Sequence, residues 1–101
     1  MVTEPLDYLV SWFRSHCDGD WENEGEIRIG TLDNPGWWLT VTLVGTELEG
    51  RTLDRGLVQR SEDDWIDVRS DGNRFEGNGG PSNIRELLAA FQAFAEGRSN
   101  G

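Results

Sequence analysis

Side chains that commonly perform catalysis are scarce in this sequence, and their spacing restricts the chemistry open to them. The chain holds one His, one Cys and one Tyr, and it has no Lys. His16 and Cys17 are neighbours in a predicted helix, where side chains about 100° apart cannot form the hydrogen bond of a catalytic Cys–His pair. The clustered Cys and His ligands of a zinc site are absent as well. This inventory favours a protein that is not an enzyme and that uses no cofactor.

An acidic residue occupies every second position of one segment, namely Asp18, Asp20, Glu22, Glu24 and Glu26. In an extended segment these carboxylates share one face, where like charges about 7 Å apart repel each other unless water or a cation screens them. Three interpretations remain open: a solvated loop, a contact for a basic protein surface, and a Ca²⁺ site. An EF-hand requires Gly at its sixth position and Glu at its twelfth, where this segment has Asn23 and Ile29.

The overall charge is strongly negative. Nine basic residues, all of them Arg, and 19 Asp or Glu give a formal net charge of −10. A second acidic run, Glu62-Asp63-Asp64, precedes Trp65 and adds to the same field. Nucleic acids and anionic membrane surfaces repel a domain of this charge, so we expect a basic protein partner.

The length of 101 residues allows a single domain, which we expect to span residues 1–97, with residues 98–101 as a flexible tail. No stretch approaches the ~20 apolar residues that cross a bilayer. One Cys cannot form an intramolecular disulfide. The N-terminal segment lacks basic residues and carries Glu4 and Asp7, which argues against a signal peptide. We therefore expect a cytoplasmic protein that is a monomer or a weak homodimer.

Apolar residues recur at three- and four-residue intervals near both ends of the sequence, which is typical of amphipathic helices. The first helix is expected over residues 3–17, with Thr3 as its N-cap. Its expected apolar stripe comprises Leu6, Leu9, Val10, Phe13 and Cys17, with Trp12 at the border of the core. The second helix is expected over residues 83–96, where Asn83 and Glu86 have the spacing of a capping box.

Between the helices the apolar period changes to two, which indicates β-strands. Two hairpins are expected, formed by residues 27–32 with 37–44 and by residues 65–69 with 74–77. Residues 51–60 are expected to form an edge strand with a kink at Gly56. This order predicts an α+β fold: an N-terminal helix, a four- to five-stranded antiparallel meander sheet and a C-terminal helix, with both helices packed on one face of the sheet.

Alternation along the strands sorts the aromatic residues between the two faces of this sheet. If Trp37, Ile66 and Val68 face the helices, then Trp38 and Trp65 lie on the opposite face. The same opposite face carries Arg28, Thr40, Thr42, Asp67 and Arg69. Trp and Arg are over-represented at interface hot spots, so this face predicts a binding surface unless the termini or the loop after the second strand covers it.

Five features, in order along nearly the whole chain, resemble the immunity protein 53 family of bacterial polymorphic toxin systems. They are the aromatic first helix with Trp12, Cys17-Asp-Gly-Asp-Trp-Glu22, Thr31-Leu-Asp-Asn-Pro-Gly-Trp37, Ser61-Glu-Asp-Asp-Trp65, and Gly77-Asn-Gly-Gly80. Asp18 and Asn23 depart from the family's usual Cys-Asn-Gly-Asp-Trp-Glu-His. Because position 23 is not His, a metal or catalytic role for that position is disfavoured.

The resemblance implies an inhibitor that is encoded beside a secreted toxin, binds that toxin and has no enzymatic activity. An acidic domain with exposed Trp suits the basic cleft of a nuclease toxin, in which charge raises the association rate and aromatic anchors slow dissociation. The expected toxin-binding residues are Asp18, Asp20, Trp21, Glu22, Glu24, Trp38, Glu62, Asp63, Asp64 and Trp65. The alternative function is a small acidic metal- or ligand-binding module that holds Ca²⁺ at residues 18–26.

Overall fold

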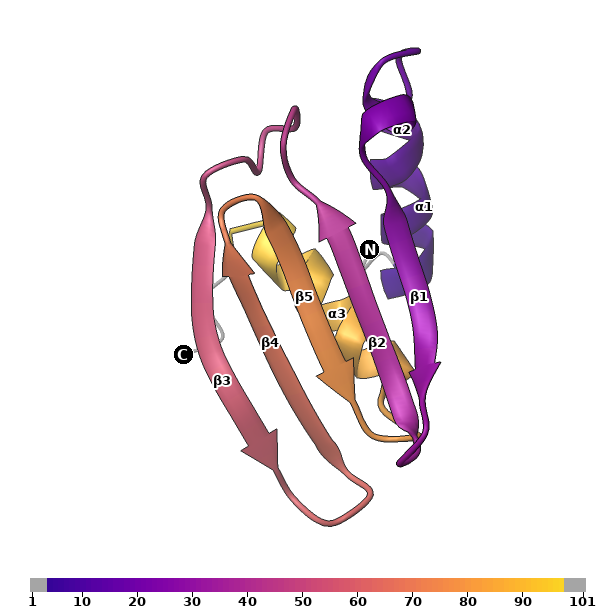
Figure 1. Ribbon diagram of the computed structural model, residues 1–101, viewed down its shortest axis with the longest axis vertical. Coiled ribbons are helices and arrows are strands. Elements are labelled where there is room, and N and C mark those ends of the chain that lie inside the picture. The colour runs from indigo at the N-terminus through magenta and orange to yellow at the C-terminus, as the bar shows by residue number, and fades with distance from the viewer. Residues whose placement is uncertain (1–3, 98–101) are drawn as a thin grey trace.

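A five-stranded antiparallel sheet forms one layer of the protein, and two longer helices form a second layer on one of its faces (Figure 1). The computed structural model describes residues 4–97, so the expected N-cap Thr3 and the tail 98–101 lie outside the described residues. In chain order the elements are α1 (Pro5–His16), α2 (Trp21–Glu24), β1 (Ile27–Leu32), β2 (Gly36–Thr42), β3 (Thr52–Gln59), β4 (Trp65–Asp71), β5 (Arg74–Gly79) and α3 (Ile84–Ala95). The predicted α+β class is confirmed. Within the described part of the chain, no helix has the length and apolar character needed to span a membrane.

The strand order across the sheet is β1-β2-β5-β4-β3, which makes β1 and β3 the two edges. Both predicted hairpins are present, β1 with β2 and β4 with β5. The predicted meander is wrong at one connection, because the chain leaves β2, passes the ends of β5 and β4, and enters the sheet again at the far edge (Figure 1). Leu48 in this connection is fully buried, which anchors the crossing segment to the core. The predicted kink in the edge strand is confirmed by a register shift between Asp54 and Gly56, where Gly56 has a φ of 76°.

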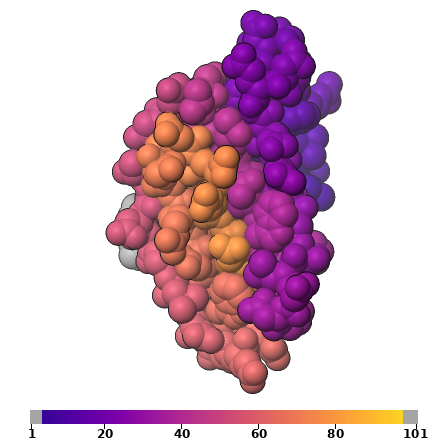
Figure 2. Space-filling model, in the orientation of Figure 1, coloured from indigo at the N-terminus to yellow at the C-terminus, as the bar shows by residue number. Residues whose placement is uncertain are grey.

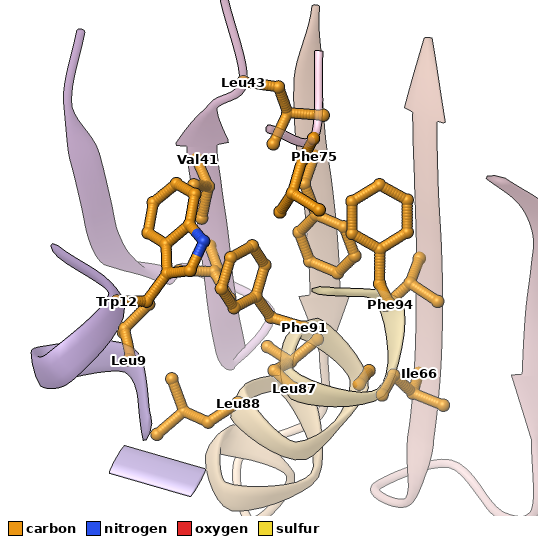
Figure 3. Close-up of a cluster of buried hydrophobic side chains, with 14 of the residues drawn as sticks. Leu9, Trp12, Val41, Leu43, Ile66, Phe75, Leu87, Leu88, Phe91 and Phe94 are labelled. Carbon is orange, nitrogen blue, oxygen red and sulfur yellow. The ribbon is translucent and has the colours of Figure 1, made fainter. Parts of the chain in front are cut away.

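The sheet face toward the helices carries the core. Fully buried side chains on this face are Leu39, Val41, Leu43, Ile66 and Phe75. From the helix layer, Phe91 packs against Phe75 with ring centroids 5.3 Å apart and nearly perpendicular planes (Figure 3). Gly77 lets α3 approach the sheet closely, since a Cβ at this position would lie 2.9 Å from the Leu87 side chain. The Gly-rich end of β5 therefore serves helix–sheet packing.

α1 buries only one residue of its predicted apolar stripe, Leu9, together with Trp12, which was predicted at the border of the core. Leu9 and Trp12 are each only 5% exposed. The stripe residues Leu6, Val10 and Phe13 remain 51%, 48% and 37% exposed. Cys17, which was expected to complete the stripe, is exposed too. The apolar flank, as we call Leu6, Val10 and Phe13, is thus a surface feature.

Packing against α3 explains this choice of face. The Trp12 indole lies edge-on to the Phe91 ring, with centroids 5.2 Å apart (Figure 3). Its Nε1 donates a 2.9 Å hydrogen bond to Glu47 of the β2–β3 connection. An indole buries more apolar area than an aliphatic side chain, and its polar N–H is satisfied here, so Trp12 rather than Leu6 or Val10 sets the orientation of α1.

The predicted capping box at the start of α3 is wrong, although Asn83 does occupy the N-cap position. Instead of capping the main chain, its Nδ2 donates 2.9 Å hydrogen bonds to both Asp64 and Glu86. Arg60 donates to the same two carboxylates at 2.7 Å and 2.6 Å. These hydrogen bonds, chiefly those from Arg60, hold the pKa of Asp64 and of Glu86 below their ordinary values. The network fastens the β3–β4 loop to α3.

Replacing Trp12 with Ala should lower the free energy of unfolding by about 3–5 kcal/mol, because the change leaves a cavity between α1 and α3. Val10→Ala on the same helix is the matched control and should change stability by less than about 0.5 kcal/mol, since Val10 is half exposed. Urea denaturation of both variants measures the difference. Similar losses for the two variants would contradict the assignment of the buried face.

Candidate functional site

The acidic segment after α1 folds into a compact turn, so its carboxylates do not have the one-face arrangement that an extended segment would give. Asp18 Oδ1 accepts the main-chain N–H groups of Asp20 and Trp21 at 2.9 Å and 3.0 Å. The Glu22 carboxylate accepts those of Asp18 and Gly19 at 3.0 Å and 2.8 Å. These reciprocal bonds start the single helical turn α2, because they satisfy N–H groups that lack partners at a helix start.

An acidic hollow of about 700 Å³ lies between this turn and one end of the sheet. Its charged lining residues, which define the acidic hollow, are Asp18, Asp20, Glu24, Asp71, Arg74 and Glu76. One guanidinium therefore faces five carboxylates. The hollow is strongly negative, and it is wide enough to receive cationic side chains of a partner protein.

Three of these lining residues, Asp71, Arg74 and Glu76, are absent from the predicted site. They reach the hollow because β5 lies beside β2, with Arg74 opposite Thr42, so the β4–β5 turn stands next to α2. The sequence does signal that turn through its Gly and Asn residues. It carries no signal for the long-range pairing that brings the turn to residues 18–25.

Two carboxylates of the hollow are held in their charged form by the main chain. Asp71 accepts the N–H groups of Asn73 and Arg74 at 2.8 Å and 2.9 Å, in the same manner as Asp18 accepts those of Trp21 and Asp20. These backbone hydrogen bonds lower the pKa of Asp18 and the pKa of Asp71 below their ordinary values. Both side chains are thus negative at any physiological pH.

The sheet face away from the helices, here called the outer face, has no covering element among residues 4–97 (Figures 1 and 2). The register confirms the predicted distribution of side chains, because Trp38 lies opposite Asn78 and Asn78 lies opposite Asp67. Trp38 and Trp65 are both partly exposed on this face. The described loop after β2 does not cover them.

Trp38 lies flat on the outer face because its neighbour on β1 has no side chain. A Cβ at Gly30 would come within 2.3 Å of the indole. The Arg28 guanidinium carbon lies over the ring, 5.7 Å from its centroid, within the range of a cation–π contact. A shallow depression of about 110 Å³ beside Trp38 shares Thr42 and Arg74 with the acidic hollow, so the two features adjoin.

The second predicted acidic run lies at the opposite end of the sheet, in the β3–β4 loop (Figure 1). Glu62 and Asp63 are exposed there, whereas Asp64 is engaged by Arg60 and Asn83 within the molecule. The predicted toxin-binding residues therefore separate into two groups along a molecule with a longest extent of 41 Å. Trp38 and the acidic hollow form the group with the greater concentration of charge.

Trp21, also predicted to contact the toxin, is instead part of the core and only 7% exposed. Its ring meets those of Trp12, Phe13 and His16 at centroid distances of 5.7 Å, 6.0 Å and 5.8 Å. The indole Nε1 is buried without a hydrogen-bond partner in the described structure. Trp21 fastens α2 to α1 and forms the inner wall of the acidic hollow rather than an exposed anchor.

Geometry at the one His and the one Cys does not support nucleophilic catalysis. His16 Nε2 lies 2.5 Å from Glu47 Oε2, while the Cys17 thiol donates to the Phe13 carbonyl at 3.2 Å. Desolvation, with the negative charges of Glu22 and Asp18, raises the pKa of the Cys17 thiol. Glu47 has a lowered pKa, because hydrogen bonds from His16 and Trp12 outweigh the opposing effect of its burial.

The Ca²⁺ alternative finds no supporting geometry in residues 4–97, where no group of three or more His, Cys, Asp or Glu is arranged to hold a metal ion. The carboxylates of Asp18 and Glu22 bond to main-chain N–H groups instead. In the acidic segment, the carboxylates of Asp18 and Glu22 thus stabilise the turn, and Asp20 and Glu24 line the hollow.

Fold and site together define a small acidic α+β domain with one sheet face that no element of residues 4–97 covers, and a negative hollow at one end of that face. The family model named Immunity protein 53 matches residues 6–96, and the chain belongs to this family. The resemblance seen in the sequence motifs is thereby confirmed. Neither the curated proteins nor the solved structures include a match to this chain.

Titration of Asp18 should show a pKa below the ~3.9 of an unperturbed Asp, because the main-chain donors favour the carboxylate. A group whose pKa is lower in the folded state stabilises the protein above its unfolded pKa, and this contribution disappears as pH falls through the folded pKa. NMR titration of the side-chain carboxyl measures the value. The Asn side chain of Asp18→Asn retains an accepting oxygen but does not titrate. The free energy of unfolding of this variant should therefore change less than that of the unmodified protein as pH falls into the acidic range. A pKa at or above the ordinary value would contradict this account of the turn.

Proposed function

We propose that this protein binds a cognate secreted bacterial toxin and neutralises it by direct contact, without catalysing a reaction. The observation that carries the proposal is the outer face, uncovered among residues 4–97, where the depression lined by Trp38 adjoins a strongly acidic hollow. The chain that carries this face is a member of an immunity protein family. In this proposal the protein acts in the cytoplasm of the producing cell. There it meets toxin that enters from kin or that remains after synthesis.

The toxin class that fits the surface best is a basic nuclease domain. A protein with a net charge of −10 attracts a basic cleft over a distance of about a Debye length, ~8 Å at physiological ionic strength. The five carboxylates of the acidic hollow concentrate this field at one end of the outer face. A nuclease cleft must be positive because it binds phosphates, so an acidic inhibitor competes for the same side chains.

Trp38 is the side chain best prepared to anchor such a contact. Gly30 beneath it and Arg28 above it already define the position of the ring in the free protein. Little conformational entropy is then lost when a partner covers the indole. Trp65 supplies a second partly exposed indole on the same face, on the neighbouring half of the sheet.

Trp38→Ala should weaken toxin binding about 30-fold, which corresponds to roughly 2 kcal/mol for a hot-spot residue. Trp65→Ala should weaken it as well. The binding partner for the measurement is the C-terminal domain of the secreted protein encoded beside this gene, and calorimetry gives the Kd. The fold should persist in both variants, because both indoles lie outside the core.

Leu57→Ala is the matched control, since Leu57 is an apolar residue on the same face but at the far edge and is 58% exposed. Gly30→Ala tests the same anchor in a second way and should also weaken toxin binding, because the added Cβ displaces the Trp38 indole without removing it. Unchanged affinity in both Trp38→Ala and Gly30→Ala would overturn the anchor assignment. Absence of any binding to the neighbouring toxin domain would overturn the proposed function.

Removing two charges from the acidic hollow should slow association with the toxin. The variant Asp20→Asn with Glu24→Gln leaves the capping carboxylates Asp18 and Glu22 intact, so the turn keeps its shape. At low ionic strength we expect an association rate about tenfold lower and a weaker dependence on salt. Stopped-flow kinetics at several salt concentrations measure both quantities.

A control with the same change in net charge is available at the other end of the molecule. The variant Glu62→Gln with Asp63→Asn alters two exposed carboxylates of the β3–β4 loop. Its association rate should fall much less if the acidic hollow directs the encounter. Equal effects of the two double variants would show that only the total charge matters.

A further inference from the structure

The outward edge of β1 carries main-chain groups without partners in the described structure. β1 is an edge strand, and among residues 4–97 its one pairing partner is β2. The Glu26 carbonyl accepts the Thr42 N–H, which establishes that residues 26, 28, 30 and 32 direct their main-chain groups toward β2. The N–H and C=O groups of Ile27, Ile29 and Thr31 therefore point away from the sheet.

β1 lacks the features that protect the other edge from pairing. β3 is interrupted by a bulge at Asp54 to Gly56 and carries charged side chains beside it. β1 pairs with β2 over six consecutive positions without a shift in register, and Arg28 is its one charged residue. A regular and nearly uncharged edge is a template for a further strand.

The apolar flank of α1 lies on the same side of the molecule as this edge. α1 meets α3 through Tyr8 and Trp12, whose rings contact Phe91. Leu6, Val10 and Phe13 follow at helical spacing on the flank turned away from α3. In Figure 1, α1 lies behind β1, the edge strand on this side of the sheet.

Ile29 adds an exposed apolar side chain on the strand itself. Its partner Leu39 faces the core, so the Ile29 side chain points to the same helix side of the sheet. It is nevertheless 44% exposed, because β1 is at the edge and nothing described lies beside it. The edge of β1 thus offers main-chain hydrogen bonds, and beside them an apolar strip for alternate side chains of an added strand.

We propose that the edge of β1 and the apolar flank of α1 receive an extended segment of the toxin, which adds to the sheet as a sixth strand. This inference rests on the proposed function and specifies how the partner is held. The segment carries apolar side chains at alternate positions, directed toward Ile29, Val10 and Phe13. Main-chain hydrogen bonds to Ile27, Ile29 and Thr31 supply a contact that does not depend on the partner's sequence.

Charge around the site indicates basic residues at the ends of that segment. Glu4, Asp7 and Glu26 are exposed near α1 and β1, and the acidic turn of residues 18–24 adjoins the start of β1. The nearby positive charges are Arg14, Arg28 and Arg85, and the last donates a 2.9 Å hydrogen bond to Glu4. Arg or Lys at the flanks of the added strand meets this excess of negative charge, as in the proposed basic toxin domain.

A second copy of this chain fits the same edge poorly. Strands paired edge to edge lie about 4.8 Å apart. Pairing of β1 with β1 of a two-fold copy would therefore bring the two α1 helices, each behind its own β1, close to each other. Packed helices need ~8–10 Å between their axes. Each copy also has a net charge of −10. A lone extended segment of a basic partner meets neither obstacle.

Hydrogen exchange tests the proposal directly on the full chain, alone and with the toxin domain encoded beside the gene. The amides of Ile27, Ile29 and Thr31 should exchange quickly in the free protein and at least about tenfold more slowly in the complex. A complex in which these amides remain fast overturns the edge assignment and leaves the proposed function intact. Failure to form any complex overturns the proposed function and this inference with it.

Substitutions on the apolar flank supply an independent test. Val10→Arg should raise the Kd about 30-fold, because it removes apolar contact and places a cation against a basic partner. Ser11→Arg adds the same charge to an exposed neighbour on another face of α1 and should change the Kd less than about threefold. Equal effects would contradict the site. Slow exchange of the three amides in the free protein, with sedimentation as a dimer, would assign the edge to a second copy instead.

Discussion

Packing of the Trp12 indole against the Phe91 ring joins α1 to the rest of the molecule. The same indole donates to Glu47, so one side chain connects the first helix, the last helix and the crossing segment between β2 and β3. Because α1 packs beside α3, both helices lie on one face of the sheet (Figure 1). The outer face and the edge of β1 are left available as a consequence of this arrangement.

Two surfaces of different chemistry meet along β1. On the outer face, Arg28 and Trp38 lead to the acidic hollow, where carboxylates predominate. On the helix side, Ile29 and the apolar flank of α1 form a strip with little charge. A partner that covers both sides is held by charge and an aromatic anchor on one side, and by main-chain pairing and apolar contact on the other. Such a division combines rapid association with slow dissociation.

Several features of the fold and site were predictable from local sequence patterns. Alternation along the strands placed Trp38 and Trp65 on the outer face, and the hairpins and α3 followed from turn residues and apolar period. The acidic turn was recognised as unusual, but its shape was not predicted. Its carboxylates bond to nearby main-chain N–H groups, which favours a helical turn over an extended strand.

The sequence by itself determined the α+β class, the two hairpins, the composition of each sheet face and the family, because periodicity, turn chemistry and ordered motifs are local properties. Only the tertiary structure decided which flank of α1 is buried, that Trp21 belongs to the core, and that the β4–β5 turn completes the acidic hollow. Each of these depends on contacts between segments distant in the chain. The apolar period of α1 is satisfied by more than one orientation, and the aromatic contact with Phe91 selects among them.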